Sequence, residues 1–231
     1  NRGSKMKHVK IEGILPAIIT PFDAEGDVEF EYLRGVVRFQ LEKGVHGFFA
    51  CGTVGEGPSM STEQRKAVTE AIIKEVADKV PVIVQSGSTN TREAIDLSRH
   101  ADESGAAAVG VVSPYYFKPD PEALVEHYRL IAESVGIPVL VYNIPSLTGF
   151  NITPDIISKL CGIKNIAGVK DSSGNLIQIR EIIETAPKPI TVINGSDNLL
   201  FSALMAGVNA QISGVANIIP ELLVQLYHAF K

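Results

Sequence analysis

Short runs of apolar residues alternate along the chain with longer stretches in which apolar residues recur every three or four positions. The short runs are apolar on both faces and are bounded by turn-forming residues, a pattern typical of buried β-strands. The longer stretches have the period of an amphipathic helix that turns one face to a core. The strands predicted by this pattern span residues 13–22, 45–51, 80–86, 106–113, 138–143, 166–170, 190–194 and 210–214.

The expected helices begin at residues suited to capping. Ser61 and Gln64 have the spacing of a capping box, while Asp120 and Thr153 each precede a proline, as an N-cap residue often does. Glycine follows several helices, where a residue in the left-handed conformation commonly ends a helix. The predicted helices cover residues 33–41, a segment starting at 61, 91–103, a segment starting at 120, a short segment starting at 153, 177–183, 199–205 and 220–230.

Eight strand–helix units follow one another in this pattern. Alternating strands and helices require parallel strands, because each crossover helix returns the chain to the same end of the sheet. Eight units can close into a (β/α)8 TIM barrel, whereas a doubly wound sheet typically carries a glycine-rich phosphate-binding motif after its first strand. The chain contains neither GxGxxG nor a Walker sequence. The α/β barrel is therefore preferred, and its active site is expected where the strands end.

Composition narrows the classes of function. Of the 231 residues, 45% are hydrophobic and 20% are charged, and the net charge is −5, with no basic run beyond the first ten residues. This balance argues against nucleic acid or an anionic membrane as the main partner and favours small molecules. Cys51 and Cys161 lack any CxxC spacing, so neither a disulfide framework nor a zinc site is expected, in keeping with a cytoplasmic location.

The two ends of the chain predict the bounds of the domain. Residues 1–5 precede Met6 and lack the apolar segment of a signal peptide, so we interpret them as a remnant of cloning. Residues 6–231 are assigned to one catalytic barrel domain. The chain stops at Lys231 inside a helical pattern without a stop signal, so the domain is expected to end within its eighth helix.

Lys170 closes the sixth strand and is followed at once by the turn residues Ser172, Ser173 and Gly174. A lysine at the buried tip of a strand is desolvated, which lowers its pKa. The resulting neutral amine is the nucleophile that imine formation with a carbonyl carbon requires. The alternative is that Lys170 extends into solvent, as most lysines do.

Hydroxyl groups and exposed backbone are predicted at the other strand ends. The hydroxyls of Thr53, Tyr115, Tyr116 and Tyr142 could relay protons, and glycine-rich backbone N–H groups could hold a carboxylate, so these residues with Lys170 form a set suited to imine chemistry. Each has a simpler interpretation, such as packing for a tyrosine or an ordinary turn for the glycine-rich segment. The histidines lie away from the predicted strand tips, so no metal site is expected; they are His8, His46, His100, His127 and His228.

Five short motifs in register resemble one enzyme family. They are Gly-Thr-Val-Gly-Glu at 52–56, Pro-Tyr-Tyr at 114–116, Tyr-Asn-Ile-Pro-Ser at 142–146, Gly-Val-Lys-Asp-Ser at 168–172 and Asn-Gly-Ser-Asp at 194–197. In order and spacing they are similar to the dihydrodipicolinate synthase / N-acetylneuraminate lyase family of class I pyruvate-dependent aldolases, from Gly13 to the chain end.

The resemblance implies a role for each matching residue. Lys170 would form a Schiff base with pyruvate or another 2-keto acid, so no separate cofactor is needed. Tyr142 would be the acid/base beside it, and Thr53 would pass protons between Tyr142 and Tyr116. The residue matching Tyr116 often comes from a neighbouring subunit, which implies a homodimer or homotetramer. The remaining pocket residues would be the backbone of Thr53 and Val54, with Gly195 and Ile212 opposite.

Two positions depart from the pattern of the synthases. Val54 stands where they have a second threonine, and Leu147 stands where they have an arginine that holds the carboxylate of the aldehyde substrate. Leucine provides no charge-assisted hydrogen bond to a carboxylate. We therefore expect a neutral aldehyde partner or a 2-keto-3-deoxy sugar acid. The chain also ends before the C-terminal helical extension of full-length family members.

Three other functions remain open at this point. The first is 4-hydroxy-tetrahydrodipicolinate synthesis from pyruvate and aspartate semialdehyde, which is a step of lysine biosynthesis. The second is a dehydratase of keto-deoxy sugar acids that uses the same lysine. The third, from another class, is a barrel that binds 2-keto acids without catalysis.

Overall fold

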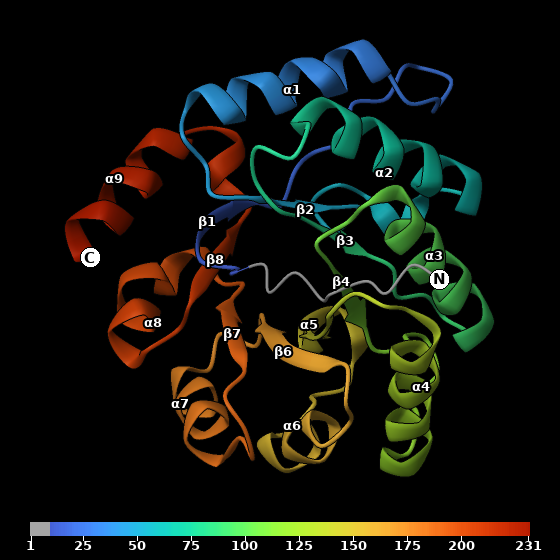
Figure 1. Cartoon of the computed structure of the whole chain (residues 1–231), viewed down its shortest axis with the longest axis vertical. Helices are drawn as coiled ribbons and strands as arrows, with labels where there is room; N and C mark the ends of the chain where they lie inside the picture. The colour runs from blue at the N-terminus through green and yellow to red at the C-terminus, as the bar shows by residue number, and fades with distance from the viewer. Residues whose placement is uncertain (1–9) are drawn as a thin grey trace, which may run out of the picture.

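The short apolar runs of the sequence form the strands at the centre of the molecule, and the amphipathic segments surround them (Figure 1). The computed structural model describes residues 10–231, so the expectations for residues 1–5, Met6 and His8 lie outside the described part. The strands are β1 (Gly13–Pro16), β2 (Phe48–Ala50), β3 (Val82–Gln85), β4 (Ala108–Val112), β5 (Val139–Asn143), β6 (Ile166–Asp171), β7 (Thr191–Asn194) and β8 (Ala210–Ser213).

The strands form one eight-stranded sheet in the order β1-β8-β7-β6-β5-β4-β3-β2. Each neighbouring pair is parallel, including β1 with β8. Backbone hydrogen bonds from His46 N to Ile14 O, 2.9 Å, and from Ile18 N to Phe49 O, 3.1 Å, join the segments of β1 and β2. These bonds close the ring, and the predicted (β/α)8 TIM barrel is confirmed.

Helices cover the outside of the barrel in chain order. They are α1 (Phe30–Glu42), α2 (Thr62–Val76), α3 (Thr91–Ser104), α4 (Pro121–Ser134), α6 (Pro154–Cys161), α7 (Leu176–Thr185), α8 (Leu200–Ala206) and α9 (Pro220–Phe230). Ser61 and Gln64 form the predicted capping box at the start of α2. Asp120 accepts a hydrogen bond from Ala123 N at the start of α4, as expected of an N-cap residue.

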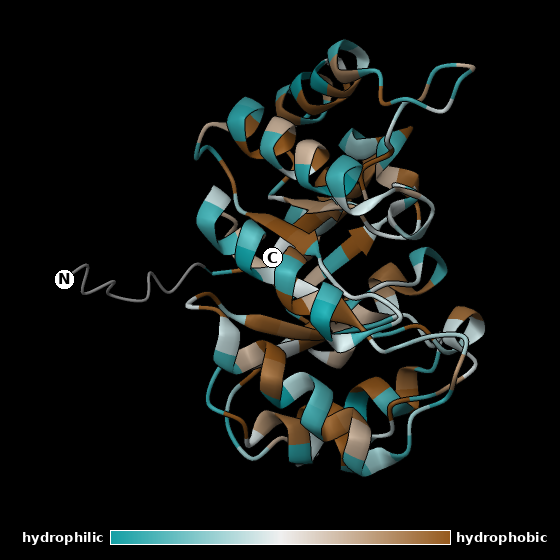
Figure 2. Ribbon diagram, turned by 90° about the vertical axis from the view of Figure 1, so that its right-hand side faces the viewer, coloured by the Kyte–Doolittle hydropathy of each residue, from teal (hydrophilic) through white to brown (hydrophobic). Residues whose placement is uncertain are grey.

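Apolar side chains divide into two cores, one on each side of the strands. The larger core lies between the barrel and its helices, and Figure 2 shows hydrophobic residues on the strands and polar ones on the outer helix faces. The smaller core fills the barrel itself. It includes Leu15, Phe49, Leu140, Tyr142 and Ile212. Alternate residues of each strand therefore face different cores, which explains why the strands are apolar on both faces.

Several predicted boundaries are wrong. The first strand ends at Pro16 rather than at residue 22, because Pro16 and Pro21 supply no N–H for a longer ladder. The second strand covers only Phe48–Ala50 of the predicted 45–51. The sixth extends one residue beyond Lys170, to Asp171.

The helix predictions missed the shortest elements. A four-residue helix, α5 (Pro145–Thr148), follows β5, and 3₁₀ turns occupy Gly57–Ser59, Asp197–Leu199 and Val215–Asn217. Segments of three or four residues are too short to show helical periodicity. Thr153 does precede α6, but its side chain makes no capping hydrogen bond.

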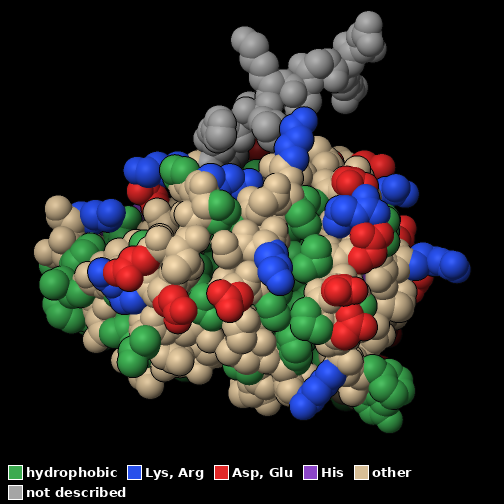
Figure 3. All heavy atoms as spheres, turned by 90° about the horizontal axis from the view of Figure 1, so that it is seen from below, with side chains coloured by type: hydrophobic (Ala, Val, Ile, Leu, Met, Phe, Trp, Pro, Cys, Tyr) green, Lys and Arg blue, Asp and Glu red, His purple; other side chains and the backbone are tan. Residues whose placement is uncertain are grey.

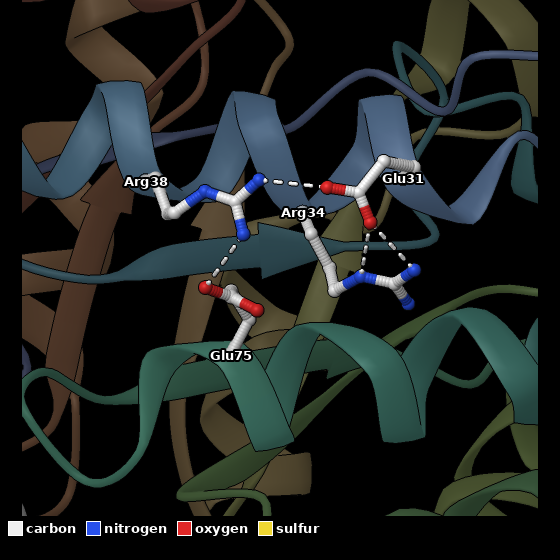
Figure 4. A network of polar contacts seen from close by, with 4 residues as sticks. All are labelled: Glu31, Arg34, Arg38 and Glu75. Atoms are coloured by element: carbon white, nitrogen blue, oxygen red, sulfur yellow. Dashed lines mark hydrogen bonds and ion pairs between the residues drawn. The ribbon is translucent and has the colours of Figure 1, made fainter.

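The surface carries interspersed charges. Arg38 of α1 pairs with Glu31 of the same helix and Glu75 of α2, and Arg34 also pairs with Glu31 (Figure 4). Most of these side chains are well exposed, so each such pair adds only about 0–1 kcal/mol. The face drawn in Figure 3 mixes acidic and basic side chains. Within residues 10–231, no helix combines the length and the apolarity that crossing a membrane requires.

Candidate active site

Lys170 lies at the C-terminal end of β6, inside the barrel mouth rather than in solvent. Its neighbour in the sheet is Tyr142 of β5, because the parallel register places these two residues directly opposite each other. Only 4% of Lys170 is exposed. The alternative of a solvated lysine does not apply.

Two aromatic rings and one hydroxyl surround the Lys170 amine. Nζ lies 3.5 Å from the centroid of the Tyr142 ring and 5.0 Å from that of Phe49. It donates a hydrogen bond to Ser172 Oγ over 3.1 Å. Burial lowers the pKa of Lys170, because desolvation penalises the ammonium form, while Tyr142 and nearby carboxylates oppose the shift. The amine is therefore biased towards its nucleophilic form.

Thr53 and Tyr142 come together at the mouth. Thr53 Oγ1 lies 3.3 Å from the Tyr142 hydroxyl, within hydrogen-bonding distance. The loop after β2 holds Thr53 in place through a sharp backbone reversal in which Cys51 and Glu56 adopt positive φ angles of 53° and 55°. A Cβ at Gly57 would collide with the carbonyl of Cys51, so this reversal requires a glycine.

The other predicted pocket residues lie at neighbouring strand ends. A Cβ at Gly195 would collide with Ser172 Oγ and lie 3.2 Å from Lys170 Nζ, so only glycine leaves room for both. Val54 Cγ2 lies 3.4 Å from the position that a Cβ of Gly214 would take, at the end of β8. Ile212 is buried in the barrel core with Tyr142.

Tyr116 lies apart from this group within the chain. It is 86% exposed and adopts a positive φ of 78°. Its ring packs edge-on against the equally prominent Phe117, with centroids 4.9 Å apart. The preceding residue, Tyr115, faces the site instead. The structure thus brings Lys170, Tyr142 and Thr53 together but leaves Tyr116 exposed and outside the cavity lining.

A cavity of about 320 Å³ opens above Tyr142. Leu147, on α5, is one of its walls and is 62% exposed. Glu56 is the one charged side chain among the lining residues, and none of them is basic. The cavity is lined by Thr53, Glu56, Pro58, Ser59, Gln85, Val112, Tyr115, Tyr142, Ile144, Leu147 and Thr148.

A buried hydrogen-bond network behind the site ties β5 to β6. Asp171 Oδ2 accepts hydrogen bonds from Asn143 Nδ2 and Gln178 Nε2, both at 2.8 Å. Its other oxygen accepts from the backbone N and the hydroxyl of Ser173. Asn143 and Asp171 directly follow Tyr142 and Lys170, and they are opposite each other in the sheet. The network therefore fixes the relative position of Tyr142 and Lys170.

Replacing Asp171 with alanine is expected to lower the free energy of unfolding by about 2–4 kcal/mol, because several buried donors lose their acceptor at once. Urea denaturation measures the change. Glu181→Ala, on the exposed face of α7, is the control and is expected to change stability by less than about 0.5 kcal/mol. A loss below about 1 kcal/mol in Asp171→Ala would show that the network does not hold the strand ends.

Sequence reasoning missed Phe49 and gave Ser172 no individual role. The signal for Phe49 was present, since alternation along β2 directs it into the barrel towards Tyr142, where the ring centroids are 5.7 Å apart. The position of Ser172 depends on the turn after β6, which residue pattern does not determine. Among the described residues, no group of three or more His, Cys, Asp or Glu side chains is arranged to hold a metal ion.

Comparison with known proteins identifies the family of this chain. Residues 10–231 match the model of the dihydrodipicolinate synthetase family. A 4-hydroxy-tetrahydrodipicolinate synthase of Methanothrix thermoacetophila is 41% identical over 219 residues, which are 94% of this chain and 74% of the relative. A protein of the same name from Methanospirillum hungatei is 44% identical over 94% of this chain and 76% of its own length.

Solved structures show the same relationship. YagE, a prophage protein of E. coli K12 solved in complex with pyruvate, is 35% identical, with a TM-score of 0.92 over 95% of this chain and 75% of its own. CdNal of Clostridium difficile, solved with mannosamine, is 29% identical, with a TM-score of 0.91 over 94% of this chain and 75% of its own. The resemblance inferred from the five motifs is confirmed: this chain belongs to the dihydrodipicolinate synthase family of pyruvate-dependent aldolases and lyases.

Proposed function

We propose that the protein forms a Schiff base between Lys170 and pyruvate and uses it to make or break a carbon–carbon bond. The observation that carries this proposal is the buried Lys170 amine beside the Tyr142 ring, with the Tyr142 hydroxyl within reach of Thr53 Oγ1. Burial supplies a neutral nucleophile, and the two hydroxyls supply a path for protons. No further cofactor is required, because the imine itself withdraws electrons.

The chemistry follows from these groups. The lone pair of Lys170 Nζ attacks C2 of pyruvate, and the carbonyl oxygen leaves as water after receiving one proton from the amine and one from Tyr142. The resulting iminium accepts electrons, so loss of a proton from C3 gives an enamine. The enamine adds to an aldehyde carbon, whose oxygen takes up a proton, and water releases the 4-hydroxy-2-oxo acid. Cleavage is the same sequence reversed.

The carboxylate of pyruvate would lie against the Thr53–Val54 backbone, with Gly195 and Ile212 lining the opposite side. This assignment is supported by the closeness of Gly195 to the Lys170 amine and by the exposure of Thr53 and Val54 in the loop after β2. Backbone N–H groups in such a reversal bind anions well. YagE, which is 35% identical, was solved in complex with pyruvate.

The second substrate is a neutral aldehyde, or in the cleavage direction a 2-keto-3-deoxy sugar acid. The cavity beside Tyr142 is lined by hydroxyl, amide and apolar groups together with one acidic residue, Glu56. Such a lining suits a polyhydroxylated aldehyde, whereas a carboxylate would meet no basic side chain and would face Glu56. A dehydratase acting on keto-deoxy sugar acids would use the same Lys170 imine.

Incubating the protein with pyruvate and a panel of aldehydes tests this function. Turnover of a neutral hydroxyaldehyde, at least tenfold more efficient than that of aspartate semialdehyde, is expected, with Lys170→Ala as the inactive control. The converse preference would favour 4-hydroxy-tetrahydrodipicolinate synthesis, the activity for which several relatives are named. Binding of pyruvate without turnover of any aldehyde would favour a barrel that binds 2-keto acids without catalysis.

Exchanging Leu147 for arginine is expected to improve kcat/KM for aspartate semialdehyde roughly 10- to 100-fold. A new charge-assisted hydrogen bond to a substrate carboxylate is worth about 1.5–3 kcal/mol. Leu147 is exposed at the cavity wall, so the longer side chain has room. Leu147→Gln, which is similar in length but uncharged, is the control. Equal behaviour of the two variants would mean that this position does not select for charge.

Assembly into a homodimer or homotetramer is part of the same proposal. Tyr116 and Phe117 form an exposed aromatic pair held by strained backbone, and large aromatic side chains are typical anchors of interfaces. In a symmetric dimer Tyr116 would reach the site of the partner subunit and complete the path of hydroxyls from Thr53. One relative, a dihydrodipicolinate synthase variant that is 34% identical, is described as monomeric.

A further inference from the structure

The hydroxyl of Ser172 contacts Lys170 Nζ but has no role in the proposed Schiff-base chemistry. Ser172 Oγ accepts a hydrogen bond from Lys170 Nζ over 3.1 Å. The Ser172 residue is half-buried, whereas Lys170 is buried. A hydroxyl both accepts and donates a proton, unlike the aromatic rings on the other sides of the amine.

Backbone hydrogen bonds at the strand ends hold Ser172 in position to contact the Lys170 amine. Ser172 N donates to Asn143 O of β5, and Gly195 N, after β7, donates to Asp171 O, both over 2.8 Å. These two bonds fix the backbone on either side of Ser172. The missing side chain of Gly195 then leaves the space that Ser172 Oγ occupies next to the amine.

We propose that Ser172 is a further catalytic residue, which relays the proton that must leave Lys170 during imine formation. This inference rests on the proposed Schiff-base function of Lys170. Ser172 Oγ accepts a hydrogen bond from Nζ, while the Tyr142 ring lies 3.5 Å from the amine and the Tyr142 hydroxyl lies within hydrogen-bonding distance of Thr53. The two hydroxyls therefore serve different steps.

Ser172 is unchanged at the end of the proton relay. The Nζ lone pair forms the C–N bond to C2 of the keto acid as the carbonyl π pair moves to oxygen, which leaves an extra proton on nitrogen and a negative charge on oxygen. Ser172 Oγ takes the proton from Nζ while its own proton passes to the oxyanion. A neutral carbinolamine forms, and the serine hydroxyl is regenerated. Tyr142 then supplies the proton with which the hydroxyl group leaves as water.

The rate of imine formation tests the relay directly. The full-length protein is mixed with pyruvate, quenched with borohydride at successive times, and the reduced adduct is quantified by mass spectrometry. Ser172→Ala is expected to slow the approach to the final adduct level about a hundredfold, the lower end of the effect of positioned proton transfer, and to leave that final level unchanged. Ser172→Thr keeps a hydroxyl and is expected to stay within about fivefold of the natural protein.

Ser158→Ala is the control, because this serine lies on α6 and its hydroxyl donates to Thr185 O rather than to a group of the site. It is expected to stay within about threefold. Equal rates for Ser172→Ala and the natural protein would overturn the proposal, as would equal slowing by Ser172→Ala and Ser158→Ala. Ser172→Gly provides a second loss of the hydroxyl if the alanine variant does not fold. Absence of any adduct in the natural protein would instead reject the Schiff-base function itself.

Discussion

Replacing Lys170 with methionine is expected to abolish turnover while making the barrel more stable at neutral pH. The substitution removes the nucleophile, so kcat/KM should fall at least about a thousandfold, equivalent to roughly 4 kcal/mol of transition-state stabilisation. Methionine has a similar length and no charge to desolvate, and it fits irregular apolar space. The gain in unfolding free energy should be roughly 0.5–2 kcal/mol, as is common where function maintains a destabilising group.

The stability gain should depend on pH in a defined direction. Burial lowers the pKa of Lys170 in the folded state below its ordinary value of 10.5, which it keeps when unfolded. Between these two pKa values the unfolded chain binds more protons than the folded one, so the stability of the natural protein rises with pH. Lys170→Met lacks this contribution, and the gap between the two proteins should narrow from pH 7 towards pH 10.

Urea denaturation of both proteins at several pH values measures this gap. Lys188→Met is the control, since this lysine lies outside the barrel mouth and donates to the carbonyl of Ile163. A Lys170→Met variant that is less stable than the natural protein at pH 7, or a gap that widens with pH, would contradict a desolvated amine.

Removing the Tyr142 hydroxyl is expected to produce the second largest loss. Tyr142→Phe keeps the ring, and with it the edge-on contact to Phe49 and the surface under the Lys170 amine. The substitution removes the hydroxyl that donates the proton, and Thr53 Oγ1 loses its contact with that hydroxyl. Loss of positioned proton transfer should lower kcat by about 10² to 10⁴-fold, with a smaller change in KM.

Tyr128→Phe is a matched control for this variant. Tyr128 is also buried, but it belongs to the core between the barrel and its helices, where its hydroxyl donates to Val111 O over 2.8 Å. Its loss should cost about 1 kcal/mol of stability and leave kcat within about twofold. A Tyr142→Phe enzyme that keeps more than a tenth of the natural kcat would mean that another group is the acid.

The sequence was informative where a single local pattern determined the structure. The strand containing Lys170 predicted a buried amine, because four apolar residues precede the lysine and turn residues follow it. The alternation of strands and helices predicted the parallel barrel, which in turn placed Thr53 and Tyr142 at the same mouth.

The features that the sequence did not predict depend on contacts between distant segments or on very short helices. The four residues of α5, which carry Leu147 into the cavity wall, show no helical period. The hydrogen bond from Lys170 to Ser172 depends on room left by Gly195, more than twenty residues further along the chain. The environment of Tyr116 in an assembly is determined by a second chain, so neither the sequence pattern nor a single folded chain specifies it.

The proposed function depends on the Lys170 amine as the covalent catalyst. Reduction of the protein with borohydride in the presence of pyruvate, followed by proteolysis and mass spectrometry, tests it most directly. One reduced pyruvyl group per chain on Lys170, with matching loss of activity and no adduct in Lys170→Met, is the expected result. An adduct on any other lysine, or a fully active and unmodified protein after treatment, would contradict the account.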